Sequence, residues 1–341
     1  MLKKLLTKKN MKNIFKNKNV LIAGGTGMVG IPLSKKLYEL GANVYIASLD
    51  KIKGDQKKII NKFYKLDLIN VDNCLKVTKN KDIVFNLLGV TGSPKINYSN
   101  PGSFMMSNLY CAVNLLYASQ KNKVKRYLYT STYGVYGKSL EMKEENVWKT
   151  FPSEHDKYAG WAKRMGELQV EAYQKEFNFD GLHIVRPANI YGPNLNYNPK
   201  NSMVVASLIK RVFDNENPLV VWGDGSNIRD FIYCDDVAEA MVKVVQKNIK
   251  KPINIGSGKG VSIKNLIKTI VNSKLVKKKP RIIYDVSKKS GDKKRVLVTK
   301  FAQRNGITHN TPLRKGIENS ILWYLQNKKS INKYKFNQFK K

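Results

Sequence analysis

Residues 19–30 read NVLIAGGTGMVG, an apolar run followed by a stretch that contains Gly24, Gly27 and Gly30. The apolar run predicts a buried strand, and the residues that follow it, up to Gly41, have the spacing of an amphipathic helix. Glycines at a strand–turn–helix junction allow a tight turn and let the backbone approach a pyrophosphate, whose charge the helix N-terminus stabilises. The stretch therefore predicts a dinucleotide-binding α/β fold.

Beyond this junction, short β-branched runs alternate with longer helical patterns as far as Gly192. This alternation predicts βαβ units and hence a Rossmann-type, doubly wound parallel sheet. The pattern then loosens, which predicts a smaller C-terminal substrate-binding lobe. We expect a basic N-terminal extension over residues 1–18, a Rossmann domain over 19–192, a lobe mostly over 193–328 from which about 228–257 return to the Rossmann domain, and a basic tail over 329–341.

The composition is strongly basic, with 62 Lys and Arg against 25 Asp and Glu and a formal charge of +37. The lysines are dispersed and no nucleic-acid-binding module is visible, so we interpret the charge as a solvated surface, without a specific nucleic-acid partner. A basic polyanion-binding protein is the least favoured alternative. No apolar run reaches the roughly 18 residues that span a bilayer, so no membrane association is expected. Three scattered cysteines predict neither disulfides nor a metal site, and they fit a reducing cytoplasm.

Several further motifs follow the glycine stretch in order along the chain. They are KLDL at residues 65–68, NLLG at 86–89, YTSTYGVYG at 129–137, RPANIYGP at 186–193 and VVWGDGSNIRDFIYCDD at 220–236. Together they resemble the extended short-chain dehydrogenase/reductase family of NAD-dependent epimerase/dehydratase type, from about Val20 to Tyr324. The resemblance implies an NAD(P)-dependent nucleotide-sugar epimerase or oxidoreductase that acts on an NDP-hexose.

The same resemblance implies a set of residues around the nicotinamide cofactor. They are Gly24, Gly27, Met28, Val29, Gly30, Ser48, Asp50, Asp67, Leu68, Leu87, Leu88, Lys163 and Pro187. Ser48 lies where an acidic residue would grip the ribose diol, and the nearby Lys51 and Lys53 tolerate a 2′-phosphate. NADP is therefore slightly favoured, while NAD stays open because Asp50 lies only two residues further on.

The resemblance also implies a nucleotide-diphosphate sugar bound by Asn189, Trp222, Arg229 and Arg295. A guanidinium fork matches the geometry of a phosphate, so two arginines can hold the diphosphate and leave the sugar free to vary. The alternative is that each arginine only pairs with a carboxylate, such as Asp230 or Asp292. We expect a homodimer.

The catalytic residues implied by the family are a hydroxyl at Thr132, a lysine at Lys163 and a tyrosine four residues before that lysine. Residues 156–167 read DKYAGWAKRMGE, so Ala159 occupies the tyrosine position and Tyr158 lies five residues before Lys163. Five residues correspond to about 140° around a helix, against about 40° for four. Either the first turn is distorted so that Tyr158 swings in, or the chemistry does without a tyrosine here; Tyr158 is the provisional acid/base.

The residue pattern from Asn189 onward resembles that of the GDP-L-fucose synthases, which combine epimerisation with reduction. Those enzymes carry a histidine acid where this chain has Met203, and a cysteine acid/base where it has Gly134. The acidic pair of the 4,6-dehydratases would fall on Tyr133 and Gly134, so dehydration is not expected. The sequence thus predicts epimerase/reductase chemistry with altered acid/base residues. The alternative is a catalytically weak member that binds cofactor and nucleotide-sugar.

Overall fold

The computed structural model describes residues 12–52, 54–90, 99–138, 141–199, 201–288 and 291–331. Most of the expected N-terminal extension and of the basic tail lies outside these ranges, as does Lys53. Within the described ranges, no helix is both long enough and apolar enough to cross a membrane.

The central element is a seven-stranded sheet with the order β10-β6-β5-β4-β1-β2-β3. Its strands are β1 (Asn19–Ala23), β2 (Asn43–Ser48), β3 (Lys62–Lys65), β4 (Ile83–Asn86), β5 (Arg126–Thr130), β6 (Leu182–Pro187) and β10 (Ile253–Ile255). All neighbouring strands pair in parallel. The strand order reverses between β1 and β4, and ligands of such sheets bind at this point, beyond the carboxyl ends of the strands. The prediction of a Rossmann-type doubly wound sheet is confirmed.

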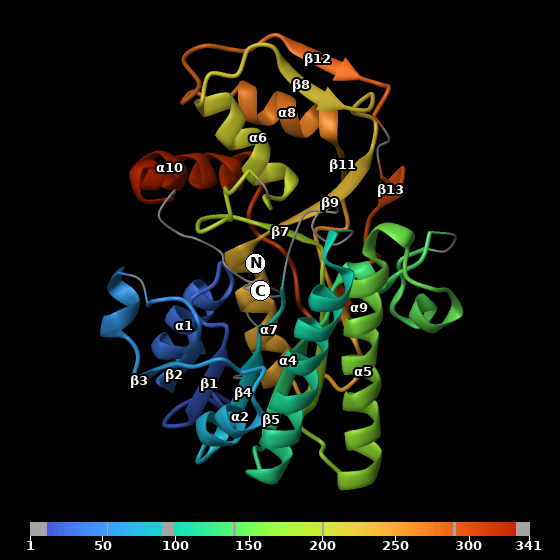
Figure 1. Cartoon of the computed structure of the whole chain (residues 1–341). Coiled ribbons are helices and arrows are strands. Elements are labelled where there is room, and N and C mark those ends of the chain that lie inside the picture. The colour runs from blue at the N-terminus through green and yellow to red at the C-terminus, as the bar shows by residue number, and fades with distance from the viewer. Residues whose placement is uncertain are drawn as a thin grey trace, which may run out of the picture.

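Helices cover both faces of this sheet (Figure 1). One face carries α1 (Gly30–Glu39) and α7 (Cys234–Gln246), and the other carries α2 (Val71–Thr78), α4 (Pro101–Lys121) and α5 (Lys157–Phe177). In β1, Val20 and Ile22 pack into the first of these cores, whereas Leu21 and Ala23 pack into the second. A strand buried on both faces needs apolar residues at every position, which explains the continuous apolar run that opens the fold.

A smaller lobe with a core of its own lies above the sheet (Figure 1). It is built from α6 (Val204–Phe213), β8 (Leu219–Trp222), α8 (Ile263–Val271), β12 (Ile282–Asp285) and α10 (Leu313–Ile331). A second small sheet contains β7 (Asn189–Tyr191), β9 (Ile228–Tyr233), β11 (Gly260–Ser262) and β13 (Lys294–Arg295), and α9 (Lys300–Arg304) follows it. Strand β9 therefore belongs to the small sheet, while α7 and β10 after it belong to the layers of the central sheet.

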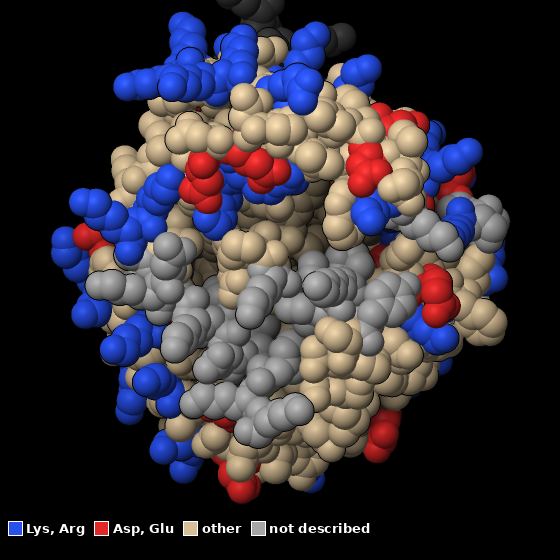
Figure 2. All heavy atoms as spheres, turned by 45° about the horizontal axis from the view of Figure 1, so that its top comes forward, with Lys and Arg blue, Asp and Glu red and all other residues tan. Residues whose placement is uncertain are grey.

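The apolar stretch over residues 181–192 is divided between two strands, β6 and β7. Strand β6 ends at Pro187, where the amide of Ala188 donates to the carbonyl of Ile255 at 2.8 Å. From Asn189 the chain leaves the central sheet and pairs with β9 instead. Asn189 therefore lies at the base of the lobe and not at the end of the central sheet. Figure 2 shows the surface hollowed between the lobe and the rest of the molecule.

Candidate active site

The glycine turn joins β1 to α1 and is shaped by close backbone packing. Gly24 has φ +79°, and a β-carbon on Gly30 would lie 2.5 Å from the backbone of Gly25. Gly27 is different, because it is exposed and a β-carbon there would meet only the carbonyl oxygen of Gly24, at 3.3 Å. Protein packing explains the glycine at position 30 but only weakly at 27. The open face at Gly27 fits the close approach of a ligand.

Side chains from β2 and the next turn hold the glycine turn in place. The hydroxyls of Ser48 and Thr26 lie 2.6 Å apart, and both residues are buried. Gln56, in the 3-10 turn η2 (Gly54–Lys58), donates to the carbonyl of Gly25 at 2.7 Å. Ser48 thus supports the turn through Thr26, and the exposed Asp50 lies just beyond it at the surface. Sequence reasoning missed Gln56, since no local motif marks it.

Lys163 on α5 reaches the carboxyl ends of two neighbouring strands. Its Nζ donates to the carbonyl of Leu88 at 3.0 Å and to the carbonyl of Thr130 at 2.8 Å. These bonds leave one N–H of the ammonium group without a partner in the described part of the chain. Burial lowers the pKa of Lys163 to about 8. The arrangement presents one donor at the edge where β4 and β5 end, which is where a Rossmann ligand lies.

Thr132 lies immediately after β5, at the same edge. It precedes the 3-10 turn η3 (Tyr133–Val135), and its Oγ1 accepts a hydrogen bond from the amide of Gly134 at 3.2 Å. Tyr133 donates its hydroxyl to Oδ1 of Asn189 at 2.9 Å, and burial raises the pKa of this phenol to about 12. Thr132 and the ammonium group of Lys163, two of the catalytic residues that the resemblance implies, therefore both lie at the carboxyl end of β5.

Tyr158 is the second residue of α5, which begins at Lys157. The 3-10 turn η5 (Glu154–Asp156) ends just before it, so the irregular winding stops short of the tyrosine. Within the α-helix, Tyr158 lies about 140° around the axis from Lys163, and Ala159 occupies the aligned position. The ammonium of Lys157 lies 6.0 Å from the centroid of the Tyr158 ring.

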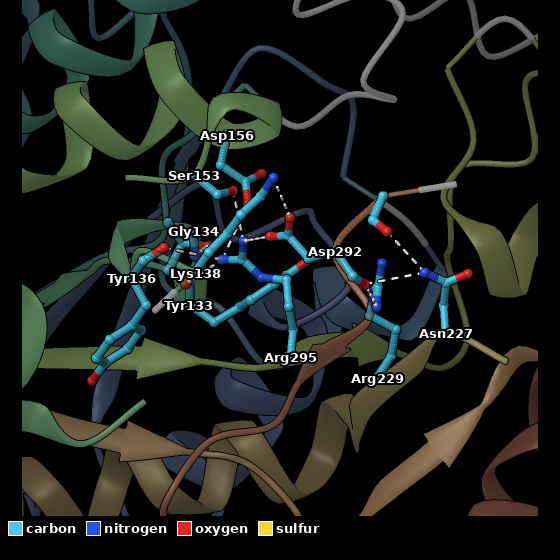
Figure 3. Close-up of polar contacts among 12 residues, drawn as sticks. Tyr133, Gly134, Tyr136, Lys138, Ser153, Asp156, Asn227, Arg229, Asp292 and Arg295 are labelled. Atoms are coloured by element: carbon cyan, nitrogen blue, oxygen red, sulfur yellow. Dashed lines mark hydrogen bonds and ion pairs between the residues drawn. The ribbon is translucent and has the colours of Figure 1, made fainter. Parts of the chain in front are cut away.

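Arg295 is buried in a network of internal partners (Figure 3). Its guanidinium group lies 2.8 Å from the carboxylate of Asp292 and 3.2 Å from that of Asp156. It also donates to the hydroxyl of Ser153 at 2.7 Å and to the carbonyl of Tyr133 at 3.0 Å. These contacts correspond to the alternative in which Arg295 pairs with Asp292. A diphosphate would bind Arg295 only by exchanging some of these contacts.

Arg229 lies to one side of this network, on β9 (Figure 3). One terminal nitrogen donates to the carbonyls of Ile228 at 2.9 Å and Asp292 at 2.7 Å. In the described part of the chain, its other terminal nitrogen and Nε have no hydrogen-bond partner. Burial lowers the pKa of Arg229, the direction expected of a cation that has no carboxylate on its guanidinium. Of the two arginines, Arg229 is therefore the one that remains available to an anion.

The other expected ligand residues are more scattered. Asn189 bridges the carbonyl of Asp230 and the hydroxyl of Tyr133, whereas Trp222 is 67% exposed at the tip of β8. Leu68 is buried in the core beside the exposed Asp67. The remaining residues of the expected cofactor set lie in the glycine turn or at strand ends: Met28 and Val29 precede α1, Leu87 and Leu88 follow β4, and Pro187 ends β6. No cluster of three or more His, Cys, Asp or Glu side chains that would hold a metal occurs in the described ranges.

A buried ionic network beneath the turn after β5 was missed from the sequence. Glu167 forms a two-bond ion pair with Arg186, with contacts of 2.9 and 2.6 Å, and it accepts the hydroxyl of Ser131. Arg186 also donates a hydrogen bond to the hydroxyl oxygen of Tyr136 at 3.2 Å. Such a fully bonded pair fixes the segment on either side of Thr132. The sequence does not indicate this pair because Glu167 lies on α5 and Arg186 on β6, so no local motif contains both.

Comparison with known proteins agrees with this geometry. A sequence model described as the NAD dependent epimerase/dehydratase family matches residues 20–256. The GDP-L-fucose synthase of Escherichia coli (strain K12) is 27% identical over 326 residues, covering 90% of this chain and 97% of that protein. The GDP-mannose 3,5-epimerase 1 of Oryza sativa subsp. indica is 29% identical over 262 residues, covering 74% and 68%. A solved GDP-L-fucose synthetase from Naegleria fowleri bound to NADP has a TM-score of 0.76 at 22% identity, covering 93% and 95%.

The parallel sheet, the reversal of strand order between β1 and β4 and the glycine turn define a protein of the Rossmann type. The chain belongs to the NAD dependent epimerase/dehydratase family. The predicted family, the enzyme class and the cofactor class, NADP or NAD, are thereby confirmed, and so is epimerase/reductase function at the level of the family.

Proposed function

We propose that the chain is an NAD(P)-dependent epimerase/reductase of a GDP-linked hexose. The observation that carries this proposal is the convergence of the glycine turn, Thr132 and Lys163 at one edge of the sheet, opposite Arg229 on the lobe. The GDP-linked relatives support the choice of nucleotide, and the likeness to the GDP-L-fucose synthase covers 90% of the chain, the lobe included.

The residues at the sheet edge fit the cofactor. Gly27 leaves room for a pyrophosphate beside the start of α1, where no side chain caps the helix and the positive end of its dipole favours an anion. Lys163 offers its remaining N–H to a ribose hydroxyl. Strand β2 ends at Ser48, whose hydroxyl contacts Thr26, and not at an acidic residue that would bind the ribose hydroxyls of NAD. This supports NADP slightly over NAD. When bound, the nicotinamide supplies the hydride chemistry.

Thr132 is the proposed partner of the reacting oxygen. Its Oγ1 accepts from Gly134, and this leaves the hydroxyl proton to be donated to a carbonyl or alkoxide oxygen. A positioned donor of this kind stabilises charge that develops on the oxygen during hydride transfer.

Tyr158 is the proposed acceptor of the proton from the sugar hydroxyl. Asp156, at the N-cap of α5, pairs with Arg295 and makes no side-chain capping bond, so the first turn of the helix lacks the stabilisation that a cap would give. Rewinding of that turn on ligand binding would move Tyr158 toward the position that Ala159 occupies. The proposal therefore includes a local change at the helix start.

Arg229 is the proposed ligand of the diphosphate, with Arg295 joining it if the ligand displaces Asp156 or Asp292. The nitrogens of Arg229 that have no described partner suit a phosphate oxygen. Asn189, at the junction of sheet and lobe, is proposed to contact the sugar, and Trp222 the nucleotide.

A second candidate is a binding protein that retains cofactor and nucleotide-sugar but turns over slowly. The observation that favours it is the residue set itself: Gly134, Ala159 and Met203 replace three groups that carry protons in the resembling enzymes. Calorimetric titration with NADPH and with GDP, combined with an assay of cofactor reduction, separates the two candidates. Binding of both ligands together with turnover supports the enzyme, and binding without turnover supports the second candidate.

We propose a homodimer formed through α4 and α5. Met106, Tyr110 and Tyr117 are exposed on α4 at spacings of four and seven residues, which place them on one face, and Leu168 is exposed on α5. The two helices pack side by side (Figure 1). Light scattering should give twice the chain mass, and Tyr110→Glu should yield a monomer; a monomeric wild type would contradict the proposal.

We also propose a cytoplasmic location, without a specific nucleic-acid or membrane partner. The three cysteines are unpaired, which suits a reducing compartment. Figure 2 shows lysines and arginines over the lobe and along the flank of the molecule. Such spread charges should bind duplex DNA weakly and lose it near physiological salt, whereas salt-resistant, sequence-selective binding would favour the polyanion-binding alternative.

A further inference from the structure

The strongest unexplained feature near Thr132 is the carboxylate of Asp156. This residue ends the turn before α5 and faces Gly134. A β-carbon placed on Gly134 would lie 3.3 Å from the carboxyl carbon of Asp156 and 3.2 Å from Cγ2 of Thr132. A side chain at position 134 would therefore press on both residues, and the carboxyl group of Asp156 lies next to where that side chain would begin.

Asp156 also differs from the other acid in the network. Its side chain is 30% exposed, whereas that of Asp292 is 7% exposed. Both carboxylates contact Arg295, but Asp292 is also paired with Lys138 at 3.3 Å. Asp292 is thus held by two cations and buried, while the side chain of Asp156 stays partly exposed beside Gly134.

We propose that Asp156 is the acid/base that exchanges a proton at the sugar carbon next to a keto group. This proposal rests on the proposed function. In the step, the carboxylate takes the proton from that carbon, the C–H electron pair becomes the C=C bond of an enolate, and the carbonyl π pair moves to oxygen. Thr132 donates a hydrogen bond to this oxygen. Asp156, now protonated, returns a proton to the carbon and regenerates the ketone.

The surroundings of Asp156 suit a base. Burial, the largest influence, raises the pKa of its carboxyl group, whereas the positive charges of Arg295, His155 and Arg229 lower it. The neighbouring carboxylate of Asp292 also raises the pKa of Asp156, and the charge of Asp156 in turn helps to keep the Tyr133 phenol protonated. The net effect is an upward shift, and a higher pKa makes a carboxylate a stronger base. The exposed part of the side chain lets the carboxyl proton exchange with water.

The test is deuterium incorporation from D₂O into a GDP-linked 4-keto-6-deoxyhexose, a probe that already carries the keto group. Incorporation is measured by mass spectrometry with the full chain and no added cofactor. Asp156→Asn keeps the size of the side chain and an acceptor for Arg295. We expect it to slow deuterium incorporation by about 100-fold or more, as loss of a general acid/base does. GDP affinity, measured by calorimetry, should stay within about twofold.

The matched control is Glu154→Gln, on the same turn, whose side chain is 65% exposed and contacts Lys157 at 3.3 Å. It should exchange at the wild-type rate. Equal rates in Asp156→Asn and the wild type would overturn the inference and leave the proposed function standing. An equal loss of GDP affinity and exchange would also overturn it, since it would show that Asp156 only supports Arg295. A wild type that fails to bind the probe would overturn the proposed function and the inference together.

Discussion

The ammonium group of Lys163 lies 3.0 Å from the carbonyl oxygen of Leu88, so α5 is tied directly to the loop that follows β4. A second bond to Thr130 ties it to the end of β5. Two carbonyls from neighbouring strands therefore aim this one cation at the edge of the sheet. The position of the donor is fixed by the backbone, whichever residue serves as the acid/base.

Cofactor affinity should fall as the pH rises through the pKa of Lys163. This pKa is lowered by burial to about 8, so the side chain is charged below that pH and neutral above it. If the charged form binds the cofactor, the affinity for NADPH should drop roughly tenfold between pH 7 and pH 9. Calorimetric titration at both values measures this. Lys163→Ala should bind weakly at both; a wild-type affinity that does not change with pH would contradict the role of the charge.

Arg229→Ala should weaken GDP binding by roughly 1.5–3 kcal/mol, as expected for a lost charged hydrogen bond. The affinity for NADPH should stay nearly unchanged, because Arg229 lies on the lobe and away from the glycine turn. Calorimetry with each ligand measures both effects. Parallel loss of both affinities would show that the variant disturbs the lobe and would count against a direct contact.

Arg295→Met should mainly destabilise the fold. The guanidinium group is 5% exposed, and its removal leaves the carboxylates of Asp292 and Asp156 without their shared cation. Breaking a buried pair in this way costs about 3–5 kcal/mol. Urea unfolding of the variant and the wild type measures the difference. A variant as stable as the wild type would show that the network contributes little.

Much of the cofactor side could be predicted from the sequence because it is built from local segments. The glycine turn needs only its own strand and helix, and Lys163 lies at a fixed place on one helix. Pairing of Arg295 with Asp292 was one of the alternatives that the sequence left open, but its contacts with Asp156 and Ser153 could not be predicted, since these residues come from the distant segment before α5. A motif names an arginine but does not say which carboxylates will reach it.

The tyrosine position illustrates the same limit. Spacing correctly indicated that Tyr158 and Lys163 share one helix and lie five residues apart. It did not show that the carboxylate two residues earlier fills the space beside Gly134. The sequence shows that glycine stands at position 134 where the resembling enzymes have a side chain. Only the fold shows which neighbouring residue fills the space that this side chain would take.

Tyr158→Phe should reduce hydride transfer by roughly 100-fold if the first turn of α5 rewinds on ligand binding, as proposed. Cofactor and GDP affinities should be unchanged because the ring is retained. Rates of cofactor reduction with GDP-L-fucose and NADP⁺ measure the effect. A variant that transfers hydride at the wild-type rate would remove Tyr158 from the mechanism.

Stability should decline as the solution becomes mildly acidic, partly because of His183. This residue is fully buried, its Nδ1 contacts the carbonyl of Ile249 at 2.9 Å, and burial lowers its pKa from 6.5 to about 4. Between these values the unfolded chain binds a proton that the folded chain does not, so stability falls as the pH falls. Between pH 7 and pH 5 this one group should account for about 2 kcal/mol.

Urea unfolding at the two pH values tests this account of His183. His183→Asn keeps a donor near Ile249 and removes the titrating group, so its stability should depend less on pH. An equally steep pH dependence in the variant and the wild type would show that other groups carry the effect.

The proposed enzyme should transfer hydride between a nicotinamide cofactor and a GDP-hexose. The purified chain is mixed with NADP⁺ or NAD⁺ and GDP-L-fucose, and with GDP-mannose in a parallel assay, and the absorbance of the reduced nicotinamide is followed. We expect reduction with at least one pair, and loss of it in Gly27→Val, whose added side chain would occupy the open face of the glycine turn. A folded wild type that neither binds a cofactor nor reduces it with either sugar nucleotide would contradict the account.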